Sequence, residues 1–398
     1  MKRIIFFICI FIIAIELGGL SMRATGVFKK KSLPAYAAEV IARCSNAGFA
    51  PSCYDIEIPK LMSHISMEEA FDVTRLVQQK DSRYLYCHVL GHNLSYRETG
   101  KDLTKWKDVV ARCPTTFCNN GCQHGAIIRR FNAESLTDAQ IEQIKPDLTD
   151  VCEPRGTWNP TEVERSMCYH ALGHLHMFIT KADIPKSVDL CTLIGTKKDG
   201  RSYVQTCTQG VLMSVYQPLE PEDFALVKGL TPTKEGVSTF CDQFTGTTWL
   251  ACHSESWPLF ATEIREPSGL MKFCAYTDNP ADEENCISTA ISILTVEMVV
   301  NRENRLDTLH AYCNGLPLLQ KGQCYASASF RLVQIDPRYV DTAIAVCTDA
   351  TGQQVGETCF RSLLTHVAHS FHAGSPEAKA FCGHFPSAWK PECLKLDR

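Results

Sequence analysis

Apolar residues recur with helical spacing along most of the chain, and the runs begin at cysteines. The run after Cys359 has its apolar positions at Phe360, Leu363, Leu364, Val367 and Phe371. Spacing of this kind places side chains on one face of a helix. The run after Cys286 is spaced in the same way. The pattern therefore predicts a helix after each of these cysteines, with one apolar face turned toward the rest of the protein.

A shorter helix is predicted before the next cysteine of the series. Asp336 stands directly before Pro337, and Ser375 stands directly before Pro376. A capping side chain followed by a proline in the first turn is a typical helix start. The apolar positions within 339–346 then lead up to a cysteine. Each unit is therefore expected to contain two helices joined by a turn.

The cysteines repeat together with the helices. Nine couples are separated by 9 to 16 residues, and their second members recur every 34 to 46 residues when Cys87 is included. The couples are Cys44 with Cys53, Cys113 with Cys122, Cys152 with Cys168, Cys191 with Cys207, Cys241 with Cys252, Cys274 with Cys286, Cys313 with Cys324, Cys347 with Cys359, and Cys382 with Cys393. Periods of this length are typical of stacked two-helix units. We predict an all-α fold, an α-solenoid of about nine disulfide-stapled hairpins over residues 37–398.

Two cysteines outside the simple pattern predict a bond between units. Cys87 begins a helix but has no partner in its own unit, and Cys118 is an extra cysteine in the next unit. Stacking brings neighbouring units together, so we predict that Cys87 pairs with Cys118 and that Cys113 pairs with Cys122. A partial zinc site at Cys118, Cys122 and His124 is the alternative, but structural zinc sites usually have paired Cys-x-x-Cys spacing, which is missing here.

The first residues have the layout of an export segment. Lys2 and Arg3 precede an almost wholly apolar run. This layout predicts a signal peptide or a signal anchor at 1–24, with a buried core helix as the alternative. Glu16 favours cleavage, because a carboxylate is costly at bilayer depth. A linker is expected at 25–36.

The cysteine count fits export from the cytoplasm. Cleavage would remove Cys9 from the total of 21 and leave 20, an even number. Even numbers of cysteines behind an export signal indicate disulfides formed in an oxidising compartment. We therefore expect an extracytoplasmic protein, whether periplasmic, secreted or membrane-anchored and facing outward.

Composition limits the classes of partner. The chain of 398 residues is 45% hydrophobic and 21% charged, as is usual for a folded protein. Its net charge of −4 argues against a nucleic-acid surface, which needs a basic excess. We expect another protein or a cell-surface component as the partner, no nucleic acid, and membrane contact only through the N-terminal segment.

The two-helix units with one cysteine couple each resemble the Sel1-like, tetratricopeptide-type repeats of secreted cysteine-rich bacterial proteins. Ala171-Leu172-Gly173, and Gly210 with Tyr216, are similar to the small-residue and Leu-Gly positions of those repeats. The resemblance extends from about Cys44 to Cys393, although the Leu-Gly-x-x-Tyr element is mostly missing. It implies an α-solenoid that presents a concave surface to a partner, and it implies nothing about chemistry.

Histidines are concentrated at the start of three consecutive units. The segments 88–92 (HVLGH) and 170–174 (HALGH) are near-copies, and the unit between them contributes His124. Two histidines four residues apart lie on one helix face, a spacing suited to metal binding. The candidate ligands for zinc or another transition metal are His88, His92, His124, His170 and His174. Structural histidines that cap loops or hydrogen-bond to the backbone are the alternative, and a ligand-contact role is a third.

The remaining candidates are weaker. His253, Glu255 and Trp257 are expected on the concave face, and Glu162 and Glu164 could supply a carboxylate to the histidines. A metal site at His366, His369 and His372 is disfavoured, since the last two should lie on a solvated helix edge.

Catalytic motifs are missing from the sequence. It contains no Gly-x-Ser-x-Gly, Gly-x-Gly-x-x-Gly or P-loop pattern. A non-enzymatic binding or scaffold module is therefore the favoured function. A metal-binding protein or metalloenzyme that uses the histidine cluster is the alternative.

Overall fold

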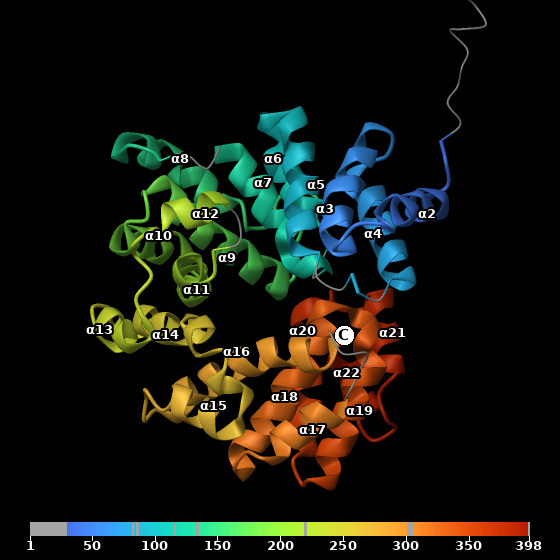
Figure 1. The fold of residues 1–398 in the computed structure, drawn as a ribbon, viewed down its shortest axis with the longest axis vertical. Coiled ribbons are helices and arrows are strands. Elements are labelled where there is room, and N and C mark those ends of the chain that lie inside the picture. Colours follow the sequence, from blue (N-terminus) through green and yellow to red (C-terminus); the bar gives the residue numbers. More distant parts are fainter. Residues whose placement is uncertain are drawn as a thin grey trace, which may run out of the picture.

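The computed structural model describes most of the chain after residue 29. The described residues are 30–81, 83–84, 87–114, 117–131, 135–218, 221–300 and 306–396. The predicted export segment, 1–24, lies outside them. Within these ranges the chain is helical apart from turns, loops and two isolated bridges, Arg155 with Trp158 and Thr196 with Ser202 (Figure 1). The predicted all-α class is confirmed.

The helices follow one another with short connections. In the first half they are α2 (Leu33–Cys44), α3 (Ala50–Lys60), α4 (Met67–Lys80), α5 (His88–Lys101), α6 (Trp106–Ala111), α7 (Gly121–Phe131), α8 (Asp138–Asp150), α9 (Glu162–Ile179), α10 (Ile184–Gly195), α11 (Val204–Tyr216) and α12 (Pro221–Leu226). In the second half they are α13 (Val237–Cys241), α14 (Gly246–Glu255), α15 (Pro267–Cys274), α16 (Pro280–Met298), α17 (Leu306–Asn314), α18 (Leu318–Ile335), α19 (Val340–Gly352), α20 (Gly356–Ser370), α21 (Pro376–Gly383) and α22 (Lys390–Leu396).

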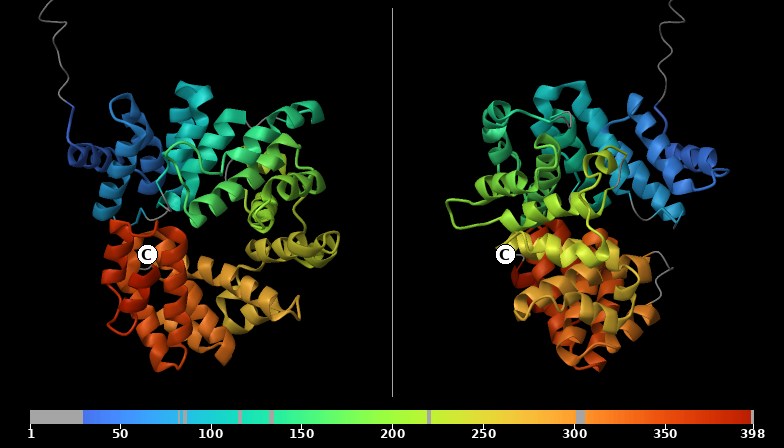
Figure 2. Two further views of the ribbon diagram at one scale, coloured as in Figure 1. Left: turned by 180° about the vertical axis from the view of Figure 1, so that it is seen from behind. Right: turned by 60° about the vertical axis from the view of Figure 1, so that its left-hand side comes forward.

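The helices that contain the second cysteine of each couple, together with α5 after Cys87, form one continuous series. Each packs against the next, in the order α3, α5, α7, α9, α11, α14, α16, α18, α20 and α22. The series also turns back on itself, because α20 contacts α9. The C-terminal half therefore lies against the N-terminal half, as both further views show (Figure 2). The chain is more closed than the open rod or arc that repeated hairpins alone would suggest.

All ten predicted disulfides are present, including the bond between units. Cys87 is joined to Cys118 and Cys113 is joined to Cys122. The other eight bonds join the predicted couples, which are Cys44 with Cys53, Cys152 with Cys168, Cys191 with Cys207, Cys241 with Cys252, Cys274 with Cys286, Cys313 with Cys324, Cys347 with Cys359, and Cys382 with Cys393. Each of these eight ties two neighbouring helical segments across a short connection. Closing such loops lowers the entropy of the unfolded chain, which stabilises the folded protein by about 3 kcal/mol per bond in the loop-entropy model.

The cysteine positions relative to the helices vary along the chain. Cys53, Cys168 and Cys324 were each expected at the start of the longer helix of a unit. Instead they lie inside α3, α9 and α18, which begin at Ala50, Glu162 and Leu318. Each helix therefore begins in the connection, before the second cysteine. Cys168 and Cys324 are fully buried, whereas Cys53 is half-buried near the N-terminal edge of the first core.

The helix ends differ from the expected ones in two further places. α2 begins at Leu33, inside the segment expected as a linker, because Pro34 is tolerated in a first turn. α19 continues past Cys347 to Gly352, and α20 begins at Gly356, so the connection is shorter than expected. Among the residues that the structure describes, no helix combines the length and hydrophobicity that crossing a bilayer requires.

Buried side chains form two apolar cores. The first core extends from Tyr36 to Cys252, and the second extends from Ile264 to Cys393. The half-cystines contribute to both, and most of them are fully buried. The two cores meet near Phe260, which packs against both. The histidine-bearing helices α5, α7 and α9 all belong to the first half.

Candidate metal centre

Glycines allow α5 and α7 to approach backbone to backbone. A Cβ atom on Gly125 would collide with the carbonyl oxygen of His92, and one on Gly121 would collide with that of His88. A Cβ atom on Gly91 would come within 2.9 Å of the amide nitrogen of Cys122. Only glycine fits at such contacts. The close approach brings His124 on α7 beside the two histidines of α5.

The same arrangement recurs between α9 and α11. A Cβ atom on Gly173 would collide with the carbonyl oxygen of Cys207, and one on Gly210 would collide with that of His170. α7 in turn packs against α9. Four helices therefore lie side by side, and the histidines of α5, α7 and α9 meet between them.

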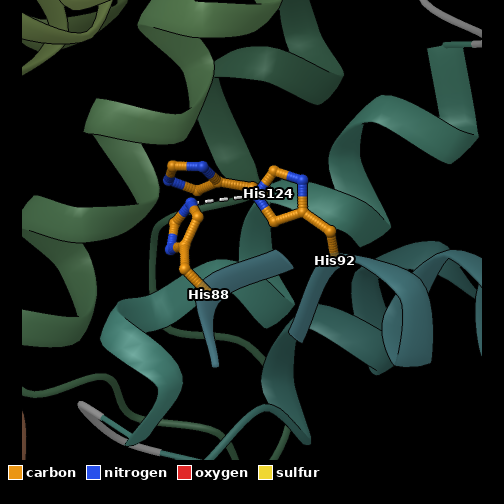
Figure 3. A group of neighbouring side chains, drawn as sticks. All are labelled: His88, His92 and His124. Carbon is orange, nitrogen blue, oxygen red and sulfur yellow. Dashed lines mark hydrogen bonds between the residues drawn. The ribbon is translucent and has the colours of Figure 1, made fainter. Parts of the chain in front are cut away.

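The first three histidines are close enough to share one ion. One ring nitrogen each from His88, His92 and His124 can be chosen so that all three lie within 4.8 Å of one another (Figure 3). The Nε2 atoms of His88 and His92 are 3.1 Å apart. Two nitrogens bound to one tetrahedral zinc ion lie about 3.3 Å apart, given Zn–N bonds of about 2.0–2.1 Å. The observed spacing is therefore close to that of a metal-bound pair.

A second triad shares one member with the first. His124, His170 and His174 also bring three ring nitrogens within 4.8 Å of one another. The Nε2 atoms of His170 and His174 are 3.2 Å apart. The ring of His124 lies 5.8 Å from that of His170 and 5.1 Å from that of His174, between centroids. All five predicted ligands thus converge, with His124 in the middle.

Neighbouring groups orient the second pair of imidazoles. Nδ1 of His174 lies 2.8 Å from Oγ of Ser214, and this hydroxyl donates to the carbonyl oxygen of Gly210. The hydroxyl therefore accepts from Nδ1–H of His174, which leaves the Nε2 lone pair turned toward His170. His170 is itself hydrogen-bonded to the backbone of Thr206. Histidine ligands of metals are usually held by such a contact through the other ring nitrogen.

Burial keeps four of the five imidazoles neutral. It lowers the pKa of His170 to about 4, and the neighbouring His88 lowers it further. Burial also holds the pKa values of His92, His124 and His174 well below the usual range, with the surrounding histidines adding to the effect. A neutral imidazole has the lone pair that a metal ligand needs. At neutral pH these four imidazoles can therefore bind a cation without first releasing protons.

A small cavity adjoins the cluster. Its volume is about 30 Å³, which is room for about one water molecule. The lining residues are His88, Val89, His92, His124, Ile128, His174, Phe178, Met213, Ser214, Gln217 and Asp223. No sequence pattern indicates the contributions of Met213, Ser214, Gln217 and Asp223, because the stretch from Cys207 to Asp223 contains no histidine. An ion held by the histidines would have space beside it for one small ligand.

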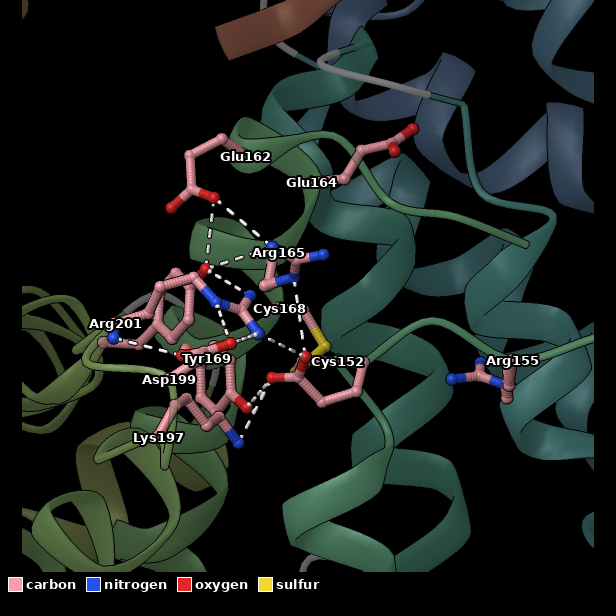
Figure 4. A network of polar contacts seen from close by, with 12 residues as sticks. Cys152, Arg155, Glu162, Glu164, Arg165, Cys168, Tyr169, Lys197, Asp199 and Arg201 are labelled. Carbon is pink, nitrogen blue, oxygen red and sulfur yellow. Dashed lines mark hydrogen bonds and ion pairs between the residues drawn. A yellow bond between two sulfur atoms is a disulfide. The ribbon is translucent and has the colours of Figure 1, made fainter. Parts of the chain in front are cut away.

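The two expected carboxylates serve other partners (Figure 4). Glu162 pairs with Arg165 and accepts a hydrogen bond from the hydroxyl of Tyr203. Glu164 accepts from the backbone nitrogen of Thr161 and so completes the helix cap of α9. Neither side chain lines the cavity. The carboxylate of the lining is Asp223.

A buried histidine near a disulfide is not part of a metal site. His176, which the sequence analysis did not single out, has Nδ1 at 3.5 Å from Sγ of Cys191 and 3.8 Å from Sγ of Cys207. These two sulfurs are bonded to each other. A disulfide has no thiolate to offer a metal. Burial lowers the pKa of His176 to about 3, so this histidine is a neutral core residue.

The other candidate residues are mostly packing groups. His253 and Glu255 are buried rather than displayed on a concave face. His253 stacks on Tyr276, and Glu255 accepts a hydrogen bond from Gln217. Trp257 is half-buried and packs against the second core. His253 and Glu255 are both on α14, which packs between its neighbours α11 and α16 in the series.

The three histidines in and just after α20 differ in exposure, and the last two are exposed as predicted. His369 and His372 are exposed, whereas His366 is fully buried. Nδ1 of His366 lies 3.2 Å from Oγ of Ser370. The three do not form a ligand group among the described residues.

Comparisons with known proteins give no relative. Protein-family models, curated proteins and solved structures contain no match to this chain. The interpretation of the site therefore rests on its geometry.

Proposed function

We propose that this protein binds a transition-metal ion at the five-histidine cluster formed by His88, His92, His124, His170 and His174. The cluster gives the ion three to five imidazole donors, and His124 is available to either triad. Imidazole is a ligand suited to zinc, copper, iron and nickel. The array of hairpins serves to hold the donors in place.

One observation supports the proposal more than any other. The Nε2 atoms of His170 and His174 are 3.2 Å apart, while the contacts to Ser214 and Thr206 hold the rings from outside. With its proton on Nδ1, His174 turns a lone pair toward a second imidazole nitrogen. The two nitrogens are at hydrogen-bond distance, and a cation that replaces the proton between them would be bound by both. A purely structural pair would have no need for a third and a fourth histidine around it.

We place this function outside the cytoplasm. Ten disulfides fit an oxidising compartment, where they form and persist. Disulfide formation also leaves no thiolate among the described residues to compete with the histidines for the ion.

Elemental analysis of untagged protein, purified with its disulfides intact, tests the proposal. We expect stoichiometric metal in the wild type and none in His124→Ala, because this substitution removes the shared member of both triads. His369→Ala, on the exposed edge of α20, is the matched control and should keep the metal. A wild-type protein without metal and without affinity for zinc, copper, iron or nickel in titration would refute the metal-binding function.

Our second proposal is a binding or scaffold function for a surface at the start of α18. Leu318 and Leu319 begin α18, and their exposed fractions are 65% and 63%. Adjacent exposed apolar side chains are typical of contact sites when they belong to a larger patch. Replacing both by serine should release the protein from the cell-surface fraction without changing its metal content. Unchanged association of this variant would exclude α18 as the contact.

A further inference from the structure

Met213 is the only sulfur ligand that the described lining of the cavity offers. It lies on α11 directly before Ser214, the residue that orients His174. Met213, Ser214 and Gln217 are spaced so that they share one face of α11, and all three line the cavity together with the histidines. A half-buried methionine at this position brings a thioether to the same small space as four imidazole rings.

The combination of imidazole and thioether selects among metals. Zinc in proteins is bound by histidine, cysteine thiolate and carboxylate. Thioether sulfur is a soft ligand that favours Cu(I). The cysteines of α7, α9 and α11 that lie near the histidines are all in disulfides, so a thioether is the sulfur available. Copper also binds imidazole more tightly than the other divalent metals of the first row do.

We propose that the ion is copper and that Met213 is a ligand of its reduced form, Cu(I), together with histidines of the five-histidine cluster. This inference rests on the metal-binding function proposed above. It adds the identity of the metal and one ligand that no histidine pattern indicates.

Competition titrations test the inference on the full-length, disulfide-bonded protein. Cu(I) is added without oxygen and without thiol reductants, against a chromophoric Cu(I) chelator, and Zn(II) is titrated separately against a zinc indicator. Met213→Leu preserves volume, so the fold should be kept. We expect this variant to bind Cu(I) roughly tenfold more weakly and Zn(II) with unchanged affinity. X-ray absorption should detect a Cu–S contact in the wild type that is missing from the variant.

Met271→Leu is the matched control, because Met271 is also half-buried but lies on α15 in the second core. It should bind both ions as the wild type does. Equal Cu(I) affinity of Met213→Leu and wild type, or no Cu–S contact in the wild type, would overturn the role of Met213. A preference of the wild type for Zn(II) over Cu(I) would overturn the assignment to copper. Neither result touches metal binding itself, which fails only if the wild type and His124→Ala are alike in binding no ion.

Discussion

Each half of the protein contains a buried histidine on a helix that also holds the second cysteine of a couple. Comparing the two histidines shows which surroundings suit a histidine to metal binding. His124 in the first half is surrounded by four other imidazoles, with His88 at 5.0 Å and His92 at 5.2 Å between ring centroids. His366 in the second half is surrounded by the rings of Phe330, Phe371 and Phe381, and it contacts Ser370. Burial lowers the pKa of both histidines, so burial alone does not distinguish them. The neighbours do.

The halves also differ in how their helices meet. In the first half, glycines at the α5–α7 and α9–α11 contacts exclude any larger residue. In the second half, a Cβ atom on Gly322 of α18 would have its nearest neighbours at 3.6 Å or more, which is ordinary contact. Close approach between the long helices of neighbouring units therefore accompanies the histidines, whereas Gly269 and Gly356 of the second half are tight against residues five or six positions earlier in the chain.

The largest expected loss of stability comes from the bond between units. Cys87–Cys118 closes a separation of 31 residues, whereas Cys382–Cys393 in the second half closes one of 11. The loop-entropy model gives about 4 kcal/mol for the first bond and about 3 kcal/mol for the second. We expect the double alanine variant at 87 and 118 to be the less stable of the two in denaturant unfolding. It should also lose metal affinity, because His88 directly follows Cys87. Equal losses of stability in the two double variants would contradict the comparison.

A glycine contact should be the next most sensitive feature. Gly125→Ala forces a methyl group against the carbonyl oxygen of His92, so we expect a loss of about 3 kcal/mol and much weaker metal binding. Gly322→Ala should instead stabilise the protein by about 0.5–1 kcal/mol, because alanine is the better helix former. Thermal unfolding and metal titration of both variants check this. If Gly125→Ala bound metal normally, the close approach of α5 and α7 would not be needed to position the ligands.

The smallest effect is expected where the halves join. Burial raises the pKa of Glu255 to about 8. Between about pH 4.5 and 8 the unfolded chain has this carboxylate ionised while the folded protein keeps it protonated, so folding stability falls as the pH rises. Glu255→Gln removes this dependence and can still accept the hydrogen bond from Gln217. We expect the variant to be more stable than the wild type near pH 8 and equally stable near pH 4, measured by denaturant unfolding.

Glu235→Gln, at an exposed position, is the control for this measurement and should leave the pH profile unchanged. A wild-type profile that is flat between pH 4.5 and 8 would mean that Glu255 is ionised in the folded protein.

The pairing of the cysteines and the convergence of the histidines could both be predicted from the sequence, for one physical reason. Residues at equivalent positions of stacked units lie close together. This brings Cys87 to Cys118, and it places His124 between the near-copies 88–92 and 170–174. The burial of His253 and Glu255 could not be predicted in this way. It depends on which side chains of the neighbouring elements cover α14, such as Gln217 and Tyr276, and the repeat pattern does not specify these.

Met213 and Ser214 were missed for a different reason. They contribute to the site because they lie on the face of α11 that is turned toward the histidines, and no sequence motif marks that face. The unit that contains α11 has no histidine. The small residues Gly173 and Gly210 were the available signal, because two glycines on consecutive helices indicate a close contact between them. Combined with the histidines on α9, that contact would have pointed to the facing residues of α11.

The short loops closed by the disulfides also determine how the protein responds to cleavage of its backbone. A protease that cleaves between Cys191 and Cys207, for example in the connection from α10 to α11, leaves both new ends attached through the intact bond. Cleavage between units, such as in the segment from α11 to α13, has no such bond across it among the described residues. Secreted proteases should therefore cut the hairpin loops without releasing fragments. The chain should separate only after a cut in a segment that no disulfide spans.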